Sequence, residues 1–380
     1  MLKKIAPFLV LPALVLMLVS FFSPEDTYDI DYLREAYGSG DPDRWPVAKL
    51  HPQVDREQFQ DIGPLPPVEF PADNPYSRAK ATLGKELFFD PVLSASNQIS
   101  CANCHDAQLG WGDGRTVSFG HDRQPGRRNA PTLLNAGHWE LFFWDGRAQT
   151  LEEQVLFPIQ DPLEMNQDLE ELVAELSDHA HYPDAFAEAF GSPGVSVERI
   201  AKALSTFERG IRSRESRFDR FVKGDYDALS DQEIAGLHLF RTKARCINCH
   251  NGPFLTDQQF HNNGQSFYGR PGQDMGLYEL TGEREDMGKF RTPSLRDIVY
   301  TGPYMHHGHI TELEEIIFMY DQGMPQHIPR KFDQDTLPVH SPLLRPLGLT
   351  EGERDDLLAF LQAISTRPRS VRPPVLPSAP

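Results

Sequence analysis

The chain has 380 residues, of which 39% are hydrophobic and 24% charged, a composition typical of a soluble globular protein with room for two domains. Its 55 acidic residues outnumber 37 lysines and arginines, which gives a formal net charge of −18. A surface this acidic repels phosphate groups, and this excludes nucleic acids and anionic lipid surfaces as primary partners.

The first 22 residues predict export from the cytoplasm. Lys3 and Lys4 precede an apolar run at residues 5–22, which is typical of a secretory signal peptide or of a single N-terminal membrane anchor. The run is near the minimum length for a membrane span and no small-x-small cleavage site follows it, so both alternatives stay open. No cysteine comes directly after the run, which excludes bacterial lipidation. We expect a periplasmic protein, either free or tethered to the inner membrane.

The rest of the chain divides into four segments. Residues 23–75 are rich in Pro, Asp and Gly, and predict an extended arm or linker. Helical patterns then continue to residue 367, and we place a boundary near residue 225, between an N-terminal domain at 76–225 and a C-terminal domain at 226–367. The Pro-rich tail at 368–380 predicts disorder.

The two domains are predicted to be mostly α. Asn74 and Pro75 are suited to cap and start a helix that reaches Phe89, and residues 195–211 carry apolar side chains at helical spacing. Four capping boxes mark further helix starts: Thr150 with Glu153, Ser230 with Glu233, Thr311 with Glu314, and Thr350 with Glu353. Alternating strand patterns are scarce.

The four cysteines form two identical frames, Cys101-Ala-Asn-Cys104-His105 and Cys246-Ile-Asn-Cys249-His250. Cys-x-x-Cys-His is the attachment motif of c-type haem, in which the thiols bond to the haem and the histidine binds the iron. A zinc site would leave both histidines unexplained, and redox dithiols belong in a βαβ context. Export agrees with haem attachment, so we predict two covalent haems.

Each frame is followed by a long Gly- and Pro-rich region, notably 109–131 and 261–292. Loops of this length in a compact domain usually bind something. The frames lie 145 residues apart, which indicates a duplicated helical unit with one haem in each copy.

Four further motifs carry a family resemblance over about residues 65 to 365. They are Arg128-Asn129-Ala130-Pro131-Thr132, Phe143-Trp144-Asp145-Gly146-Arg147, Cys249-His250-Asn251-Gly252-Pro253 and Gly302-Pro303-Tyr304-Met305-His306. With the haem frames, they make the chain resemble the bacterial di-haem cytochrome c peroxidases and their MauG-type relatives. The resemblance implies two cytochrome c-like helical domains, each with one covalently attached haem.

The resemblance also implies roles around the N-terminal haem on His105. Glu164 would move a proton between the peroxide oxygens, and Gln154 would position the peroxide. Trp144 would be an aromatic bridge between the haems. In the peroxidases a histidine at the position of His121 caps the peroxidatic iron at rest, and the alternative is a surface loop histidine. The glycines of the 109–131 loop would permit the swing that releases it.

The second haem, on His250, departs from the peroxidase pattern. Fourteen residues after His306, where the peroxidases carry a methionine ligand, this chain has Tyr320, as in the MauG-type pattern. Met319 is the alternative ligand, although it is rotated by about 100° along a helix. A thioether favours ferrous iron, whereas a phenolate favours ferric iron.

By resemblance, one calcium ion would lie between the haems, on the side-chain amide of Asn129 and the backbone carbonyls of Thr301 and Pro303. Oxygen ligands of this kind suit calcium. Sequence alone does not suggest this site.

The first functional interpretation is a periplasmic peroxidase that reduces hydrogen peroxide with electrons from a small c-type cytochrome or cupredoxin. The first alternative is a MauG-type oxidase that uses peroxide to oxidise residues of a partner protein. The second, from another class, is a non-enzymatic di-haem electron carrier, which would have no use for a proton relay such as Glu164. The sequence leaves open whether the protein forms a homodimer.

Overall fold

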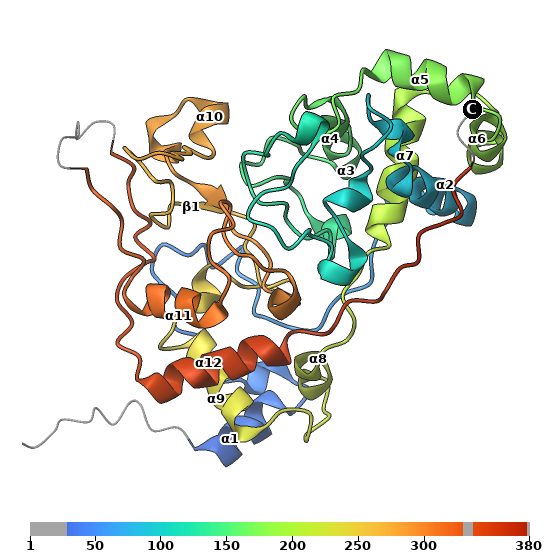
Figure 1. Ribbon diagram of the computed structural model, residues 1–380. Helices are drawn as coiled ribbons and strands as arrows, with labels where there is room; N and C mark the ends of the chain where they lie inside the picture. The colour runs from blue at the N-terminus through green and yellow to red at the C-terminus, as the bar shows by residue number, and fades with distance from the viewer. Residues whose placement is uncertain (1–28, 330–336, 378–380) are drawn as a thin grey trace, which may run out of the picture.

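The computed structural model describes residues 29–329 and 337–377, and its helices form two lobes (Figure 1). The expected mostly α class is confirmed. The helices of the N-lobe are α2 (Arg78–Phe89), α3 (Leu151–Gln154), α4 (Leu156–Gln160), α5 (Leu169–Asp178), α6 (Tyr182–Phe190) and α7 (Val197–Arg209). Those of the C-lobe are α1 (Ile30–Tyr37), α8 (Arg217–Val222), α9 (Asp231–Arg241), α10 (Tyr278–Thr281), α11 (Leu313–Asp321) and α12 (Glu351–Ala363).

The sheet found in the described residues has two short strands, β1 (Phe260–His261) and β2 (Phe290–Arg291). They are antiparallel, with Phe260 opposite Arg291. The segment at 1–22, which we expect to be a signal or an anchor, lies outside the described residues. Within 29–329 and 337–377, no helix has the length and apolar character needed to span a bilayer.

Each lobe has its own hydrophobic core. The N-lobe core extends from Leu83 to Ile211, and the C-lobe core joins residues of α1 to residues between Phe218 and Ile364. The core therefore changes between Ile211 and Phe218. As a consequence α8 packs with the C-lobe, although the boundary that we expected near residue 225 would leave it in the N-lobe.

Both lobes are built around one close helix crossing. In the N-lobe, α2 packs on α7, and a Cβ atom on Gly84 would lie 1.9 Å from the backbone oxygen of Ala203. In the C-lobe, α9 packs on α12, and a Cβ atom on Gly236 would lie 1.9 Å from the backbone oxygen of Asp356. Only glycine permits such an approach. The repeated crossing supports the duplication that the cysteine frames indicate.

The predicted helix starts are confirmed at three of the four capping boxes. Thr150, Ser230 and Thr350 are the N-caps of α3, α9 and α12, and each accepts the backbone N–H of the glutamate three residues later. The box at Thr311 is wrong, because α11 begins at Leu313 and the Thr311 hydroxyl donates to the Glu312 carboxylate (3.2 Å).

The predicted start of α2 at Asn74 is also wrong, since Ser77 is the N-cap and accepts the backbone N–H of Lys80. Asn74 is fully buried and bonds to other side chains instead. Its amide oxygen accepts from the Lys80 ammonium (2.7 Å), and its amide nitrogen donates to Glu152 (2.8 Å). These tertiary contacts compete with capping.

The arm contains a helix and packs against the C-lobe, which differs from the extended linker that we expected. In the arm, Asp29 caps α1, and the buried side chains of Leu33, Tyr37 and Ile62 join the C-lobe core. In the tail, residues 368–377 form no helix or strand, and Val371 packs against the N-lobe core. Figure 1 shows this last segment crossing from α12 back to the N-lobe. Burial of well-spaced apolar residues accounts for the packing of the arm.

Candidate functional site

Each cysteine frame opens on its own cavity. The first cavity has a volume of about 420 Å³ and is lined by the Cys101 frame, and the second has about 230 Å³ and is lined by the Cys246 frame. The two cavities share a wall, formed by Asn129, Pro131, Thr132, Trp139, Trp144 and Arg291. The shared wall places the two candidate haem sites next to each other.

The two frames have the same local geometry. Each forms one 3₁₀ turn, in which the histidine N–H donates to the carbonyl of the first cysteine, at 3.0 Å for His105 and 2.8 Å for His250. The Nδ1 atoms of these histidines lie 3.0 Å from the carbonyl oxygens of Trp111 and Leu255, respectively. A carbonyl can only accept, so Nδ1 carries the proton and Nε2 keeps its lone pair for a metal.

The four cysteines form no disulfide, so both pairs are available for attachment to a haem. Burial raises the pKa of Cys104 to about 11 and that of Cys246 to about 12, and it also raises the pKa values of Cys101 and Cys249. A redox dithiol depends on a thiolate that forms easily. These raised pKa values therefore disfavour the redox dithiol.

The second cavity has a cationic lining that fits an anionic cofactor. Three arginines line it, and no aspartate or glutamate of the described residues does. One of them, Arg245, has a buried Nη1 atom without a hydrogen-bond partner in this part of the chain. A buried donor of this kind needs an acceptor. The carboxylates of a haem would supply one, so the thiols, the free Nε2 atom and the arginines together fit a c-type haem.

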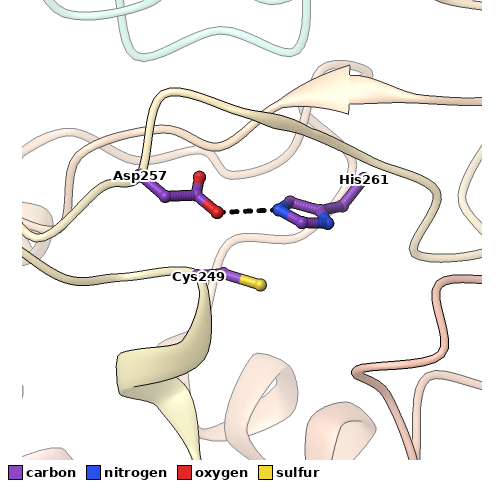
Figure 2. A group of neighbouring side chains, drawn as sticks. All are labelled: Cys249, Asp257 and His261. Atoms are coloured by element: carbon purple, nitrogen blue, oxygen red, sulfur yellow. Dashed lines mark hydrogen bonds and ion pairs between the residues drawn. The ribbon is translucent and has the colours of Figure 1, made fainter. Parts of the chain in front are cut away.

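One further cluster lies beside the second frame (Figure 2). His261, on β1, donates from Nε2 to the Asp257 carboxylate at 2.8 Å, and the Cys249 sulfur lies with them inside a radius suited to a metal ion. Burial opposes ionisation of Asp257, but the hydrogen bond from His261 holds its pKa below the usual value. Because Cys249 belongs to the haem frame, we assign this thiol to haem attachment.

Two of the predicted catalytic residues meet in the first cavity. Gln154, at the end of α3, and Glu164, in the turn after α4, both line it together with His105. Neither side chain has a hydrogen-bond partner in the described part of the chain. Burial, and then the nearby charge of Asp161, raises the pKa of Glu164 to about 7, whereas Arg147 acts in the opposite direction. Glu164 is therefore able to exchange a proton near neutral pH.

His121 is not brought into the first cavity. Its backbone N–H donates to the Glu164 carbonyl at 2.7 Å, and its Nε2 atom lies 3.6 Å from the Asp122 carboxylate. Its Nδ1 atom is buried and lacks a partner among the described residues. The residues that line the cavity include Gly120 but not His121. The backbone contact nevertheless joins the glycine-rich loop to the turn that carries Glu164.

Trp144 and the three predicted calcium ligands lie together between the lobes. The Trp144 indole donates to the Asn129 carbonyl at 2.9 Å, and the Asn129 N–H donates to the His306 carbonyl at 2.7 Å. Asn129, Thr301 and Pro303 all line the second cavity. Trp144 and the three expected calcium ligands thus all line the second cavity.

Tyr320, and not Met319, lines the second cavity. Burial raises the pKa of the Tyr320 phenol, and a hydrogen bond with the Asn263 side chain acts against this rise. The Met319 side chain lies on another face of α11, as the helical rotation of about 100° per residue requires. The geometry therefore favours Tyr320 over Met319 as the group that faces a haem on His250.

Known proteins are similar to this chain in sequence and in fold. The family model described as di-haem cytochrome c peroxidase matches residues 78–227. A cytochrome-c peroxidase IdrP1 of Pseudomonas sp. (strain SCT) is 36% identical over 333 residues, which cover 80% of this chain and 85% of the relative. The chain belongs to the di-haem cytochrome c peroxidase family. The methylamine utilization protein MauG of Methylophilus methylotrophus is also 36% identical, over 85% of this chain and 92% of the relative.

Solved structures agree with this membership. The crystal structure of a MauG-like protein associated with microbial copper homeostasis has a TM-score of 0.71 and 35% identity, and the match covers 83% of this chain and 96% of that chain. The members of this family are di-haem peroxidases, so the protein is an oxidoreductase. Membership also implies that it binds two c-type haems.

Some polar residues of the peroxidase cavities escaped the sequence analysis. Glu208, on α7, lines the first cavity with one oxygen that has no partner in the described chain, and burial raises its pKa to about 8. Arg245 and Arg291 line the second cavity. Arg245 directly precedes Cys246, and this adjacency was the one available signal. Nothing local in the sequence distinguishes Glu208 from the other acidic residues.

Proposed function

We propose that the protein is a periplasmic di-haem peroxidase that reduces hydrogen peroxide to water at the first cavity. The observation that carries the proposal is the convergence of Glu164 and Gln154 on the cavity lined by His105. The two side chains come from separate elements, and both are without partners among the described residues. An electron carrier needs neither group, so this convergence disfavours the non-enzymatic alternative.

The reaction adds two electrons and two protons to one hydrogen peroxide and yields two waters. A haem bound through Cys101, Cys104 and His105 would supply the iron that binds peroxide and the route for its electrons. Glu164 would take a proton from one oxygen of the peroxide and return it to the other oxygen, which leaves as water. The Gln154 amide holds the peroxide in place for this transfer. A pKa of about 7 suits Glu164 to both steps at neutral pH.

Electrons enter through the second cavity and cross the shared wall at Trp144. A net charge of −18 suits an electron donor with a basic docking face, such as a small c-type cytochrome or a cupredoxin. The oxygens of Asn129, Thr301 and Pro303 would hold one calcium ion beside this route. Export through the segment at 1–22 would bring the chain to the periplasm.

A MauG-type oxidase is the second candidate, and the position of Tyr320 favours it. A phenolate ligand stabilises ferric iron, so a second haem with this ligand would be a poor electron store. The absence of His121 from the first cavity lining, within the described residues, also supports a site that accepts peroxide without prior reduction. In this alternative the enzyme withdraws two electrons from residues of a partner protein.

Stopped-flow measurement of peroxide consumption tests both candidates. For the peroxidase we expect turnover with a reduced small c-type cytochrome, and we expect Glu164→Gln to lower kcat/KM by about 10²–10⁴. For the MauG-type oxidase the fully oxidised protein reacts at once with one equivalent of peroxide and then stores two oxidising equivalents. No reaction in either state would refute both candidates.

A further inference from the structure

Arg291 is a buried cation without a carboxylate partner. Its side chain lines both cavities, and the residue is only 8% exposed. Its Nε atom donates to the Phe143 carbonyl at 3.2 Å, whereas Nη1 has no partner within the described chain. Burial lowers the pKa of Arg291 to about 10, so the guanidinium stays charged at neutral pH.

Three other arginines of the described residues are as deeply buried as Arg291, and all three are paired. Arg209 donates to Glu152 at 2.7 Å, Arg241 pairs with Asp61, and Arg296 lies 2.9 Å from Asp219. Removing an arginine from water without a counter-charge is strongly unfavourable. The exception at Arg291 therefore indicates that an anion from outside the polypeptide completes this site.

The backbone fixes Arg291 between the two cavities. Its N–H donates to the Trp144 carbonyl at 2.8 Å, and strand pairing places it opposite Phe260. The guanidinium carbon lies 5.8 Å from the centre of the Trp139 ring, which also lines both cavities. The guanidinium has five N–H donors, and the bond to Phe143 uses one of them. Four remain, which is enough for two carboxylate groups.

We propose that Arg291 binds a propionate of each haem and sets the reduction potentials of both. The proposal rests on the proposed function only in requiring that both cavities hold a haem. A fixed positive charge beside both haems favours the ferrous state in each, because that state carries one positive charge less. Arg291 is thus a positioning residue that links the two centres through one side chain.

The test is a spectroelectrochemical titration of the purified di-haem protein and of Arg291→Gln. We expect both midpoint potentials to fall, with the ferric-to-ferrous ratio at a fixed potential rising about tenfold in each haem, which is a shift of about 59 mV. Arg127→Gln is the control, since its side chain lines the first cavity and is exposed. Screening by water should keep its shifts below about threefold.

An unchanged potential at either haem, or control shifts as large as that of Arg291→Gln, would overturn the proposal. If Arg291→Gln does not retain both haems, Arg291→Lys replaces it, since lysine keeps the charge but loses the planar fork. A single ammonium group cannot reach two carboxylates as the fork does, so the potential of at least one haem should fall, by less than tenfold in ratio. A fall at neither haem would again refute the assignment. The titration does not need peroxide turnover. If the protein does not reduce peroxide but both potentials shift in Arg291→Gln, the proposed function is wrong and the role of Arg291 stands.

Discussion

The pH dependence of peroxide reduction should report the ionisation of Glu164. The pKa of this carboxyl is raised from 4.5 to about 7, which corresponds to about 3 kcal/mol against the ionised form. Only the ionised form can accept the first proton from peroxide. We therefore expect kcat/KM to rise with pH and to level off above pH 7. Below that value it should fall about tenfold per pH unit, so that about a tenth of the maximum remains at pH 6.

Two neighbouring charges affect the acidic limb of the pH profile, which is the range in which kcat/KM rises with pH. Their removal should move this limb in opposite directions. The Asp161 charge raises the pKa of Glu164 and the Arg147 charge lowers it, and both side chains line the same cavity. Asp161→Asn should therefore shift the limb to lower pH, and Arg147→Gln should shift it to higher pH. The asparagine keeps an oxygen that can accept the Leu163 N–H, as Asp161 does at 2.8 Å.

The assay is steady-state peroxide reduction between pH 5 and 9 with a saturating electron donor, and Glu164→Gln is the control. This variant should lose the limb together with about 10²–10⁴ of the rate. A wild-type limb near pH 4.5, a limb that persists in Glu164→Gln, or shifts of equal sign in the two neighbour variants would refute the assignment of the proton relay to Glu164.

Three further changes test the second haem ligand, the resting state and the helix crossing. Tyr320→Met should raise the midpoint potential of the second haem, because a thioether favours ferrous iron, and Met319→Leu should leave it unchanged; a shift in Met319→Leu would make Met319 the ligand. His121→Ala should leave the absorption spectrum of the oxidised protein unchanged, since His121 lies outside the first cavity lining, and an altered spectrum would restore it as a ligand. Gly84→Ala should cost about 1–3 kcal/mol in chemical denaturation, because its Cβ meets a backbone oxygen at 1.9 Å, whereas Gly352→Ala, with open space around it, should cost nothing.

The sequence predicted the chemistry more fully than the packing. The cysteine frames and the capping boxes are local patterns. The turn at His105 and three of the four boxes agree with the short-range geometry that these patterns predict. Asn74 shows why other predictions failed, because a polar residue that is suited to capping gains more from long-range bonds when it is buried. The same applies to α1, whose apolar residues are few and find a core only in the C-lobe, about 200 residues away along the chain.

The buried charged residues that line the cavities were the part of the site that the sequence predicted least. Arg291 and Glu208 follow no motif that reveals their roles, since a charge is informative only when its partners are known. In the sequence they are two among 37 basic and 55 acidic residues. The fold removes both side chains from water. Within the described residues Arg291 is then a cation without a counter-ion, and burial raises the pKa of Glu208 to about 8.

The two cavities differ although their attachment frames are alike, and the difference lies in their linings. The first cavity contains Glu164 and Glu208, whose raised pKa values lie close to neutrality, so it can donate and accept protons. The second has arginines and no carboxylate among the described residues, and it faces Tyr320. Reduction of peroxide needs an acid–base carboxyl group at one place only, and a site whose described lining has no carboxylate can exchange electrons without competing for peroxide. A duplicated cytochrome unit can thus acquire two functions by changing the side chains that line each cavity, while the frame that attaches the haem stays the same.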